Sequence, residues 1–93
     1  MKKYKNAKEL ALAIGLSEER GQLAELKAKL TKEIILTLKH QNLTHQELSN
    51  LSGVPRSAIT GIINGSLQKV TIDRLVRILF SLGYIIDMKL KVA

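Results

Sequence analysis

The chain has 93 residues, of which 45% are hydrophobic, with no cysteine and a formal net charge of +7 at pH 7. This length fits one domain with a modest core, and the lack of cysteine excludes a disulfide framework and thiolate chemistry. No apolar run is long enough to span a membrane, and none follows the N-terminal lysines as in a signal peptide, so we expect a cytoplasmic protein.

The positive charge is spread along the chain. Residues 1–40 hold nine basic and five acidic residues, residues 41–70 hold two and one, and residues 71–93 hold four and two. A basic surplus attracts polyanions such as nucleic acid. The charge therefore favours a nucleic-acid partner for the whole chain, but it does not mark one segment as the binding unit.

Two helices are expected within residues 1–40. Residues 1–6 predict a frayed terminus or, alternatively, a basic arm over phosphates. Residues 7–14 show a short helical pattern. A long helix follows, capped by Ser17 and ending near Gln41. Its apolar residues recur at helical spacing and predict a core stripe that consists of Leu23, Leu26, Leu30, Ile34 and Leu38. The first half of this stripe is expected to pack either on residues 7–14 or on another protein.

Residues 44–65 (THQELSNLSGVPRSAITGIING) predict two short helices joined by a tight turn. Thr44 and Glu47 fit a capping box at the start of the first helix. Gly53 fits the positive φ that often follows a helix end, and Pro55 fits the start of the second helix.

The apolar spacing within this segment fits two helices that cross closely. Ser49 is small at the expected crossing point, and four apolar residues are expected to hold the crossing together: Leu48, Val54, Ile59 and Ile62. This combination is typical of a helix-turn-helix motif that binds DNA, although any corner between two helices remains an alternative.

Residues 71–83 predict a closing helix that is capped by Thr71. Its inward residues are expected to be Ile72, Leu75, Val76, Leu79 and Phe80. Residues 84–92 then change period, because Tyr84, Ile86, Met88, Leu90 and Val92 alternate with polar residues. That alternation predicts a half-buried β-strand.

A lone strand needs a partner for its backbone donors and acceptors. The same strand of a second copy would supply one across a two-fold axis, which predicts a homodimer. The predicted dimer contact consists of Tyr84, Ile86, Met88 and Leu90. Strand addition to another protein, or a disordered tail, remains an alternative.

The sequence gives no indication of catalysis, of a metal site or of a cofactor. His40 and His45 are the only histidines, and they lie on either side of a helix break without a carboxylate cluster. No glycine-rich loop follows a strand, and metal-ligand spacing is missing. We therefore predict that the protein is not an enzyme.

The run LTHQELSNLSGVPRSAITGIINGSLQKVTIDRLVRILFSLG, residues 43–83, resembles the helix-turn-helix domain of phage Cro and repressor proteins, the XRE class. The flanking segments AIGLSEER and SLGYIIDMKLKV resemble HigA-like antitoxins of bacterial toxin–antitoxin operons. The resemblance implies one all-α domain over residues 1–93. Such a domain is a compact bundle of about five helices with a phage-repressor-like helix-turn-helix and one C-terminal β-strand.

The resemblance also implies a recognition helix from Pro55 to Asn64. By position, the expected base contacts are Arg56, Ser57, Thr60 and Gly61, and the expected phosphate contacts are Thr44, His45, Asn64 and Lys69. Arg56 is favoured on physical grounds, because its planar fork can donate two hydrogen bonds to guanine. Gly61 departs from the family pattern, which has a side chain there, and Pro55 stands where Ser or Thr is more common.

The function implied by the resemblance is sequence-specific repression of the protein's own operon by a homodimer on a palindromic operator. An antitoxin of this kind also neutralises a cognate RelE/HigB-like mRNA-endonuclease toxin. The alternatives are a phage-type or general XRE-family regulator without a toxin, and a pure protein-interaction module. The small, polar outward face of the predicted recognition helix disfavours the last of these.

Overall fold

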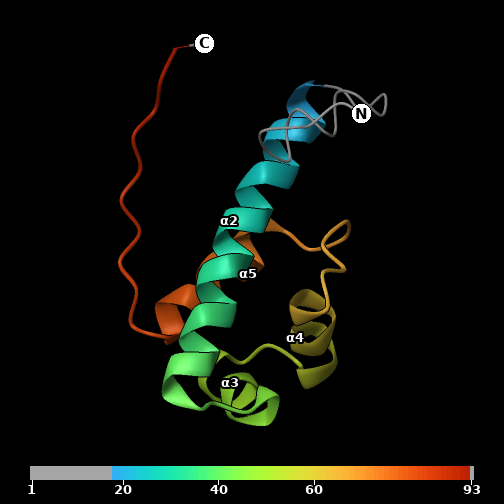
Figure 1. Ribbon diagram of the computed structural model, residues 1–93, viewed down its shortest axis with the longest axis vertical. Helices are drawn as coiled ribbons and strands as arrows, with labels where there is room; N and C mark the ends of the chain where they lie inside the picture. Colours follow the sequence, from blue (N-terminus) through green and yellow to red (C-terminus); the bar gives the residue numbers. More distant parts are fainter. Residues whose placement is uncertain (1–17, 93) are drawn as a thin grey trace, which may run out of the picture.

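The computed structural model describes residues 18–92, and this part of the chain forms an all-α domain of four helices (Figure 1). The helices are α2 (Glu18–Gln41), α3 (His45–Ser52), α4 (Arg56–Ile63) and α5 (Ile72–Ser81). The predicted helix at residues 7–14 and the predicted cap at Ser17 lie outside the described residues. The expectation of about five helices is therefore confirmed for four of them.

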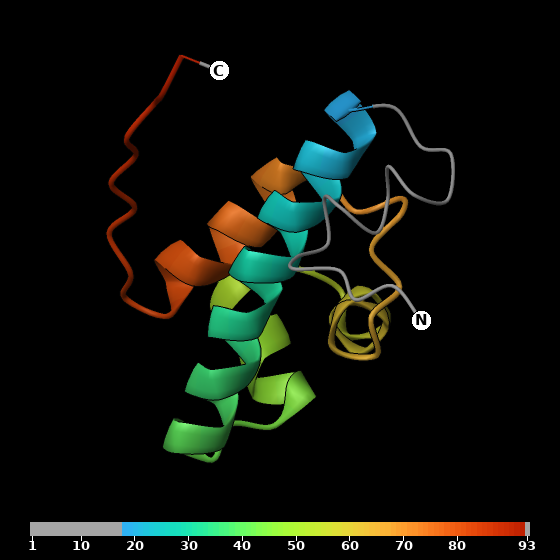
Figure 2. The ribbon, with the colours of Figure 1, turned by 45° about the horizontal axis from the view of Figure 1, so that its top comes forward.

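The long helix α2 is the central element of the domain, and α5 lies against it (Figures 1 and 2). The two short helices α3 and α4 pack on each other, α3 also packs on α5, and α4 also packs on α2. None of the described helices is both long and apolar enough to cross a lipid bilayer.

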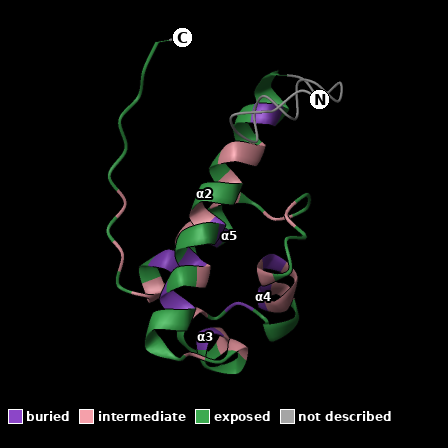
Figure 3. Cartoon of the chain, viewed as in Figure 1, coloured by how far each residue is buried: buried purple, intermediate pink, exposed green. Residues whose placement is uncertain are grey.

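One apolar core joins the four helices, and Figure 3 shows its buried segments where they meet. The four residues that were expected to hold the helix crossing together all lie in this core, which confirms that prediction. The buried apolar residues are Ile34, Leu38, Leu48, Val54, Ile59, Ile62, Leu75, Ile78 and Leu79.

The predicted core stripe of α2 is buried only in its C-terminal half. Ile34 and Leu38 are buried and Leu30 is half-buried, whereas Leu23 and Leu26 are 40% and 50% exposed. The reason is length. At about 1.5 Å per residue, α4 and α5, with 8 and 10 residues, cannot cover all 24 residues of α2.

The inward face of α5 differs from the prediction at two positions, because Ile78, which was not predicted to face inward, is buried, and Phe80 is not. Leu75, Ile78 and Leu79 are buried, but Phe80 is 57% exposed, so the prediction that Phe80 faces inward is wrong. Residues three and four apart share a helix face, so that Leu75, Ile78 and Leu79 form one stripe and Phe80 turns away from it.

The predicted β-strand at residues 84–92 is not confirmed. No strand occurs within residues 18–92, and residues 84–92 continue from α5 as an extended segment (Figures 1 and 2). A β-strand is defined by its ladder of hydrogen bonds to a neighbour. The described part of a single chain offers no second strand, so the segment keeps an extended backbone without a ladder.

Candidate nucleic-acid interface

The start of α3 carries the predicted capping box. The Thr44 side chain accepts a hydrogen bond of 3.0 Å from the Glu47 N–H, and the Glu47 carboxylate accepts one of 3.0 Å from the Thr44 N–H. This arrangement confirms the prediction. Thr44 was expected to contact DNA phosphate, but its N–H is already occupied by the Glu47 carboxylate, which places a negative charge at that point.

The turn between α3 and α4 is held by hydrogen bonds as well as by apolar packing. Gly53 has φ of +74°, as predicted, and its N–H donates to the Ser49 carbonyl at 2.9 Å. The Ser49 hydroxyl donates to the Val54 carbonyl at 2.7 Å. Ser49 was expected only to be small, so the sequence interpretation missed its role in closing the turn.

The predicted recognition helix, α4, begins after Pro55, which has φ of −56° and ψ of 141°. The N–H groups of Ala58 and Ile59 donate to the Pro55 carbonyl, and no side chain caps the helix. A proline fits this position because its missing N–H would have no partner within the helix. The uncapped N-terminal end of α4 is a favourable place for an anion.

The predicted base-contact residues divide into two pairs. Arg56 and Ser57 are exposed on the first turn of α4, whereas Thr60 and Gly61 are half-buried one turn later. A Cβ atom added at Gly61 would meet no atom within 4 Å. The first turn therefore presents the accessible polar groups, and the second turn is partly covered by the protein itself.

A hydrogen bond that the sequence interpretation missed links α3 to α4. His45 Nδ1 and Thr60 Oγ1 lie 2.9 Å apart in a hydrogen bond, and both residues are half-buried. His45 was expected to bind phosphate and Thr60 to contact a base. One hydrogen-bonding position of each side chain is therefore occupied by the link between α3 and α4.

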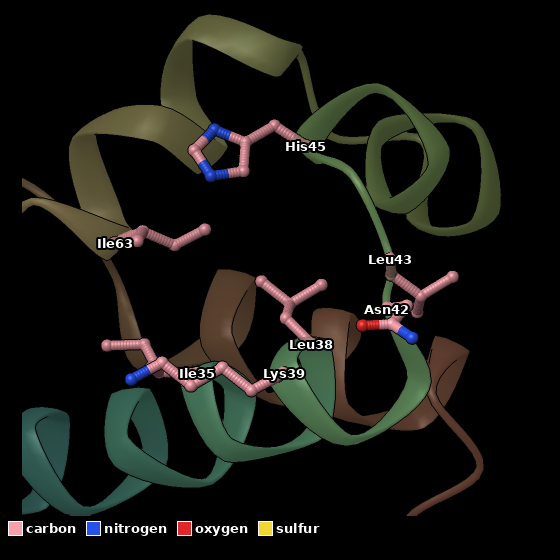
Figure 4. Close-up of a pocket in the computed structure, with 7 residues that line it drawn as sticks. All are labelled: Ile35, Leu38, Lys39, Asn42, Leu43, His45 and Ile63. Carbon is pink, nitrogen blue, oxygen red and sulfur yellow. The ribbon is translucent and has the colours of Figure 1, made fainter.

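A hollow lies beside this link, between α2 and the helix pair (Figure 4). His45 and Ile63 border it on one side, and α2 supplies the opposite side. Its full lining consists of Ile35, Leu38, Lys39, Asn42, Leu43, His45 and Ile63.

Within residues 18–92, no group of three or more His, Cys, Asp and Glu residues could hold a metal ion.

The remaining predicted phosphate contacts lie at and after the end of α4. Asn64 is the C-cap of α4, and Lys69 lies in the loop before α5; both are exposed. This loop is held against α2 by Lys27, whose Nζ donates to the carbonyls of Leu67 at 3.2 Å and Gln68 at 3.4 Å. The sequence interpretation missed Lys27, because a lysine on a polar helix face carries no signal for so distant a contact.

Comparison with known families agrees with this geometry. A family model described as a helix-turn-helix domain matches residues 15–91, which is most of the chain. Two crossing helices joined by a glycine turn, with a polar outward helix, define the class of DNA-binding helix-turn-helix proteins. The chain belongs to this helix-turn-helix domain family. Searches of curated proteins and of solved structures give no match.

Proposed function

We propose that this protein is a sequence-specific transcriptional repressor without catalytic activity, which binds its own operator as a homodimer in the bacterial cytoplasm. The observation that carries the proposal is the exposed polar first turn of α4, with Arg56 and Ser57, at the surface of a helix pair with a buried core. That turn has no side-chain cap. It therefore combines two polar side chains with the uncapped N-terminal end of a helix.

In this mechanism α4 enters the major groove. Arg56 donates two hydrogen bonds to guanine, and Ser57 accepts or donates at the neighbouring base. His45, Asn64 and Lys69 contact the flanking phosphates, which fix the position of the protein on the duplex. Two copies read half-sites that are about 34 Å apart, or a multiple of that distance, and block transcription.

The dimer part of this proposal is supported by the exposed residues 87–92 and is tested by truncation. Tyr84 and Ile86 pack against the protein's own core, whereas residues 87–92 are exposed. Removing residues 87–93 is expected to give a monomer with unchanged helix content, as measured by sedimentation equilibrium and circular dichroism. A truncated protein that remains dimeric would contradict dimerisation through this segment.

An antitoxin role is the finer part of the proposal. It is supported by the resemblance of the flanking segments to HigA-like antitoxins, and by the exposed Leu23 and Leu26, which leave one face of α2 available to a RelE/HigB-like toxin. Co-expression with the product of the neighbouring gene tests it. We expect the protein to restore the growth of cells that produce the toxin. Leu23→Lys is expected to abolish this rescue, whereas Gln22→Lys, at another exposed position on α2, is expected to keep it.

The DNA proposal is tested by titrating the protein against the duplex upstream of its own gene and against a shuffled duplex of equal composition, at two salt concentrations. We expect a preference of about 10³-fold or more for the native duplex. Equal and strongly salt-dependent binding to both would indicate attraction to phosphate alone. In that case a regulator without operator specificity, or an interaction module, would be the better interpretation.

A further inference from the structure

The C-terminal arm, residues 84–92, is attached to the domain at one end only. The Tyr84 hydroxyl donates to Glu33 Oε2 at 3.3 Å and shares a hydrogen bond of 2.6 Å with the Thr37 hydroxyl. The Tyr84 N–H donates to the Leu79 carbonyl at 3.1 Å. Ile86 also packs against the core. These contacts fix the direction in which the arm leaves the domain.

After Tyr84, every large apolar side chain of the arm except Ile86 is exposed. The exposed fractions are 93% for Ile85, 76% for Met88, 90% for Leu90 and 102% for Val92. An extended backbone with apolar side chains is a template for pairing with another strand. The charge pattern of the arm indicates which strand could pair with it.

The arm is complementary to itself in one antiparallel register. In an antiparallel pair, directly opposite residues point to the same face of the ribbon. The apolar residues of two copies therefore share a face only when the two-fold axis places one residue opposite the same residue of the second copy. An axis at Met88 places Asp87 opposite Lys89 of the second copy, twice. An axis at Lys89 places that lysine opposite itself, and an axis at Asp87 does the same for the aspartate. Like charges directly opposite each other destabilise a ladder, and opposite charges stabilise it.

The same register supplies the packing that a two-stranded ribbon needs. Two strands alone are marginally stable in water, and packing against a helix stabilises them. With the axis at Met88, Leu90 and Val92 of one copy lie opposite Ile86 and Tyr84 of the other. Ile86 and Tyr84 already lie against their own domain. The exposed end of each arm is thus placed beside the anchored end of the other arm.

We propose that the C-terminal arm pairs antiparallel with the arm of a second copy, with Met88 on the two-fold axis and Asp87 opposite Lys89. This inference rests on the homodimer proposed above and specifies its register. The register has a consequence for DNA. Moving the axis by one residue shifts one copy along the other by two residues, or about 7 Å, which is about two base pairs of duplex at roughly 3.4 Å each.

The test uses charge exchange in the full chain without DNA, with the dimer dissociation constant measured by sedimentation equilibrium at low salt. Lys89→Asp and Asp87→Lys are each expected to weaken the dimer about tenfold, because each creates two like-charge pairs. The double variant Asp87→Lys/Lys89→Asp is expected to restore the dimer to within about threefold, since it recreates both opposite-charge pairs.

Lys91→Asp is the matched control, because it changes the net charge as Lys89→Asp does but lies opposite Ile85 in the proposed register. We expect it to leave the dissociation constant within about threefold of the parent. If Lys91→Asp weakened the dimer as much as Lys89→Asp, or if the double variant failed to restore it, the register would be wrong while the homodimer remained. A chain that is monomeric at all concentrations would overturn both, and the operator titration would still test DNA binding separately.

A cysteine scan gives a second readout, because the chain has no cysteine of its own. Met88→Cys places two thiols opposite each other at the axis, where Cβ atoms of paired strands are about 4.5–5.5 Å apart. Leu90→Cys places them four residues apart, or about 13 Å. Under mild oxidation we expect Met88→Cys to cross-link at least tenfold faster than Leu90→Cys. Equal rates would contradict the register.

Discussion

The helix-turn-helix segment and the C-terminal arm represent two ways in which this chain uses apolar residues. In the helix pair, Leu48, Val54 and Ile59 are buried within the chain, and hydrogen bonds close both the first cap and the turn. In the arm, Met88 and Leu90 remain exposed on an extended backbone that the domain holds only at its beginning.

The difference shows which parts of the chain are complete by themselves. The start of α3 is closed by its own capping box, and the helix pair buries its apolar face against α2 and α5. Beyond Ile86 the arm leaves its apolar side chains exposed, and Leu23 and Leu26 of α2 are also exposed. We therefore expect the helix pair to determine folding stability, and the arm to determine association with a second copy.

The largest expected effect comes from exchanging a leucine in each region for alanine. Leu48 is 0% exposed, and Leu48→Ala is expected to lower the free energy of unfolding by about 2–5 kcal/mol, since it leaves a cavity in the core. Leu90→Ala makes the same chemical change in the arm. Urea denaturation at a protein concentration below the dimer dissociation constant is the measurement.

Leu90→Ala is expected to change the free energy of unfolding by less than about 0.5 kcal/mol, because the Leu90 side chain is 90% exposed and buries little surface in a single chain. At high protein concentration Leu90→Ala is instead expected to weaken the dimer. If Leu90→Ala destabilised the isolated chain as much as Leu48→Ala, the arm would be part of the folded domain and the contrast between the regions would fail.

Arg56→Ala tests whether the helix pair reads bases. We expect a loss of about 1–3 kcal/mol in operator binding and relaxed specificity at one base pair, because the guanidinium fork is removed. Binding to a shuffled duplex is expected to fall much less. Arg77→Ala, an exposed arginine on α5, serves as the control for the loss of one positive charge. Equal losses on both duplexes would show that Arg56 contacts only phosphate.

The link between α3 and α4 is tested by a double-mutant cycle on His45 and Thr60, whose Nδ1 and Oγ1 atoms are 2.9 Å apart. His45→Ala and Thr60→Val are each expected to destabilise the protein by about 0.5–1.5 kcal/mol, the usual net value of one hydrogen bond. The double variant is expected to lose less than the sum of the two. Strict additivity in urea denaturation would show that the hydrogen bond contributes nothing to the position of α4.

The features that the sequence predicted well are local. The capping box of Thr44 and Glu47, the left-handed Gly53 and the helix start after Pro55 each depend on residues within four positions of one another. The buried face of the helix pair followed from apolar spacing, because a helix places every third or fourth residue on one side. The family match over residues 15–91 agrees with this pattern.

The features that the sequence did not reveal depend on how distant elements meet. The contact of His45 with Thr60 and that of Lys27 with the loop carbonyls join residues 15 and 40 positions apart, and nothing in their local pattern announces them. Phe80 was expected to face inward, but it lies off the buried stripe of α5, which includes Ile78 instead. The predicted strand lacks a ladder because residues 18–92 contain no second strand with which it could pair.

The smallest expected effect concerns Gly61, the position where the recognition helix lacks a side chain. Gly61→Ala is expected to stabilise the protein by about 0.5–1 kcal/mol, since alanine is the better helix former and its Cβ would meet no atom within 4 Å. Either the glycine permits close approach of DNA to the backbone, or the helix simply makes one base contact fewer, and operator affinity separates these two explanations. The neighbouring Thr60 hydrogen bonds to α3, so this turn of α4 faces the protein in part, and we expect affinity to stay within about twofold. A tenfold loss with preserved stability would instead show that DNA approaches the backbone at Gly61, and would place the second turn of α4 within the base-reading surface.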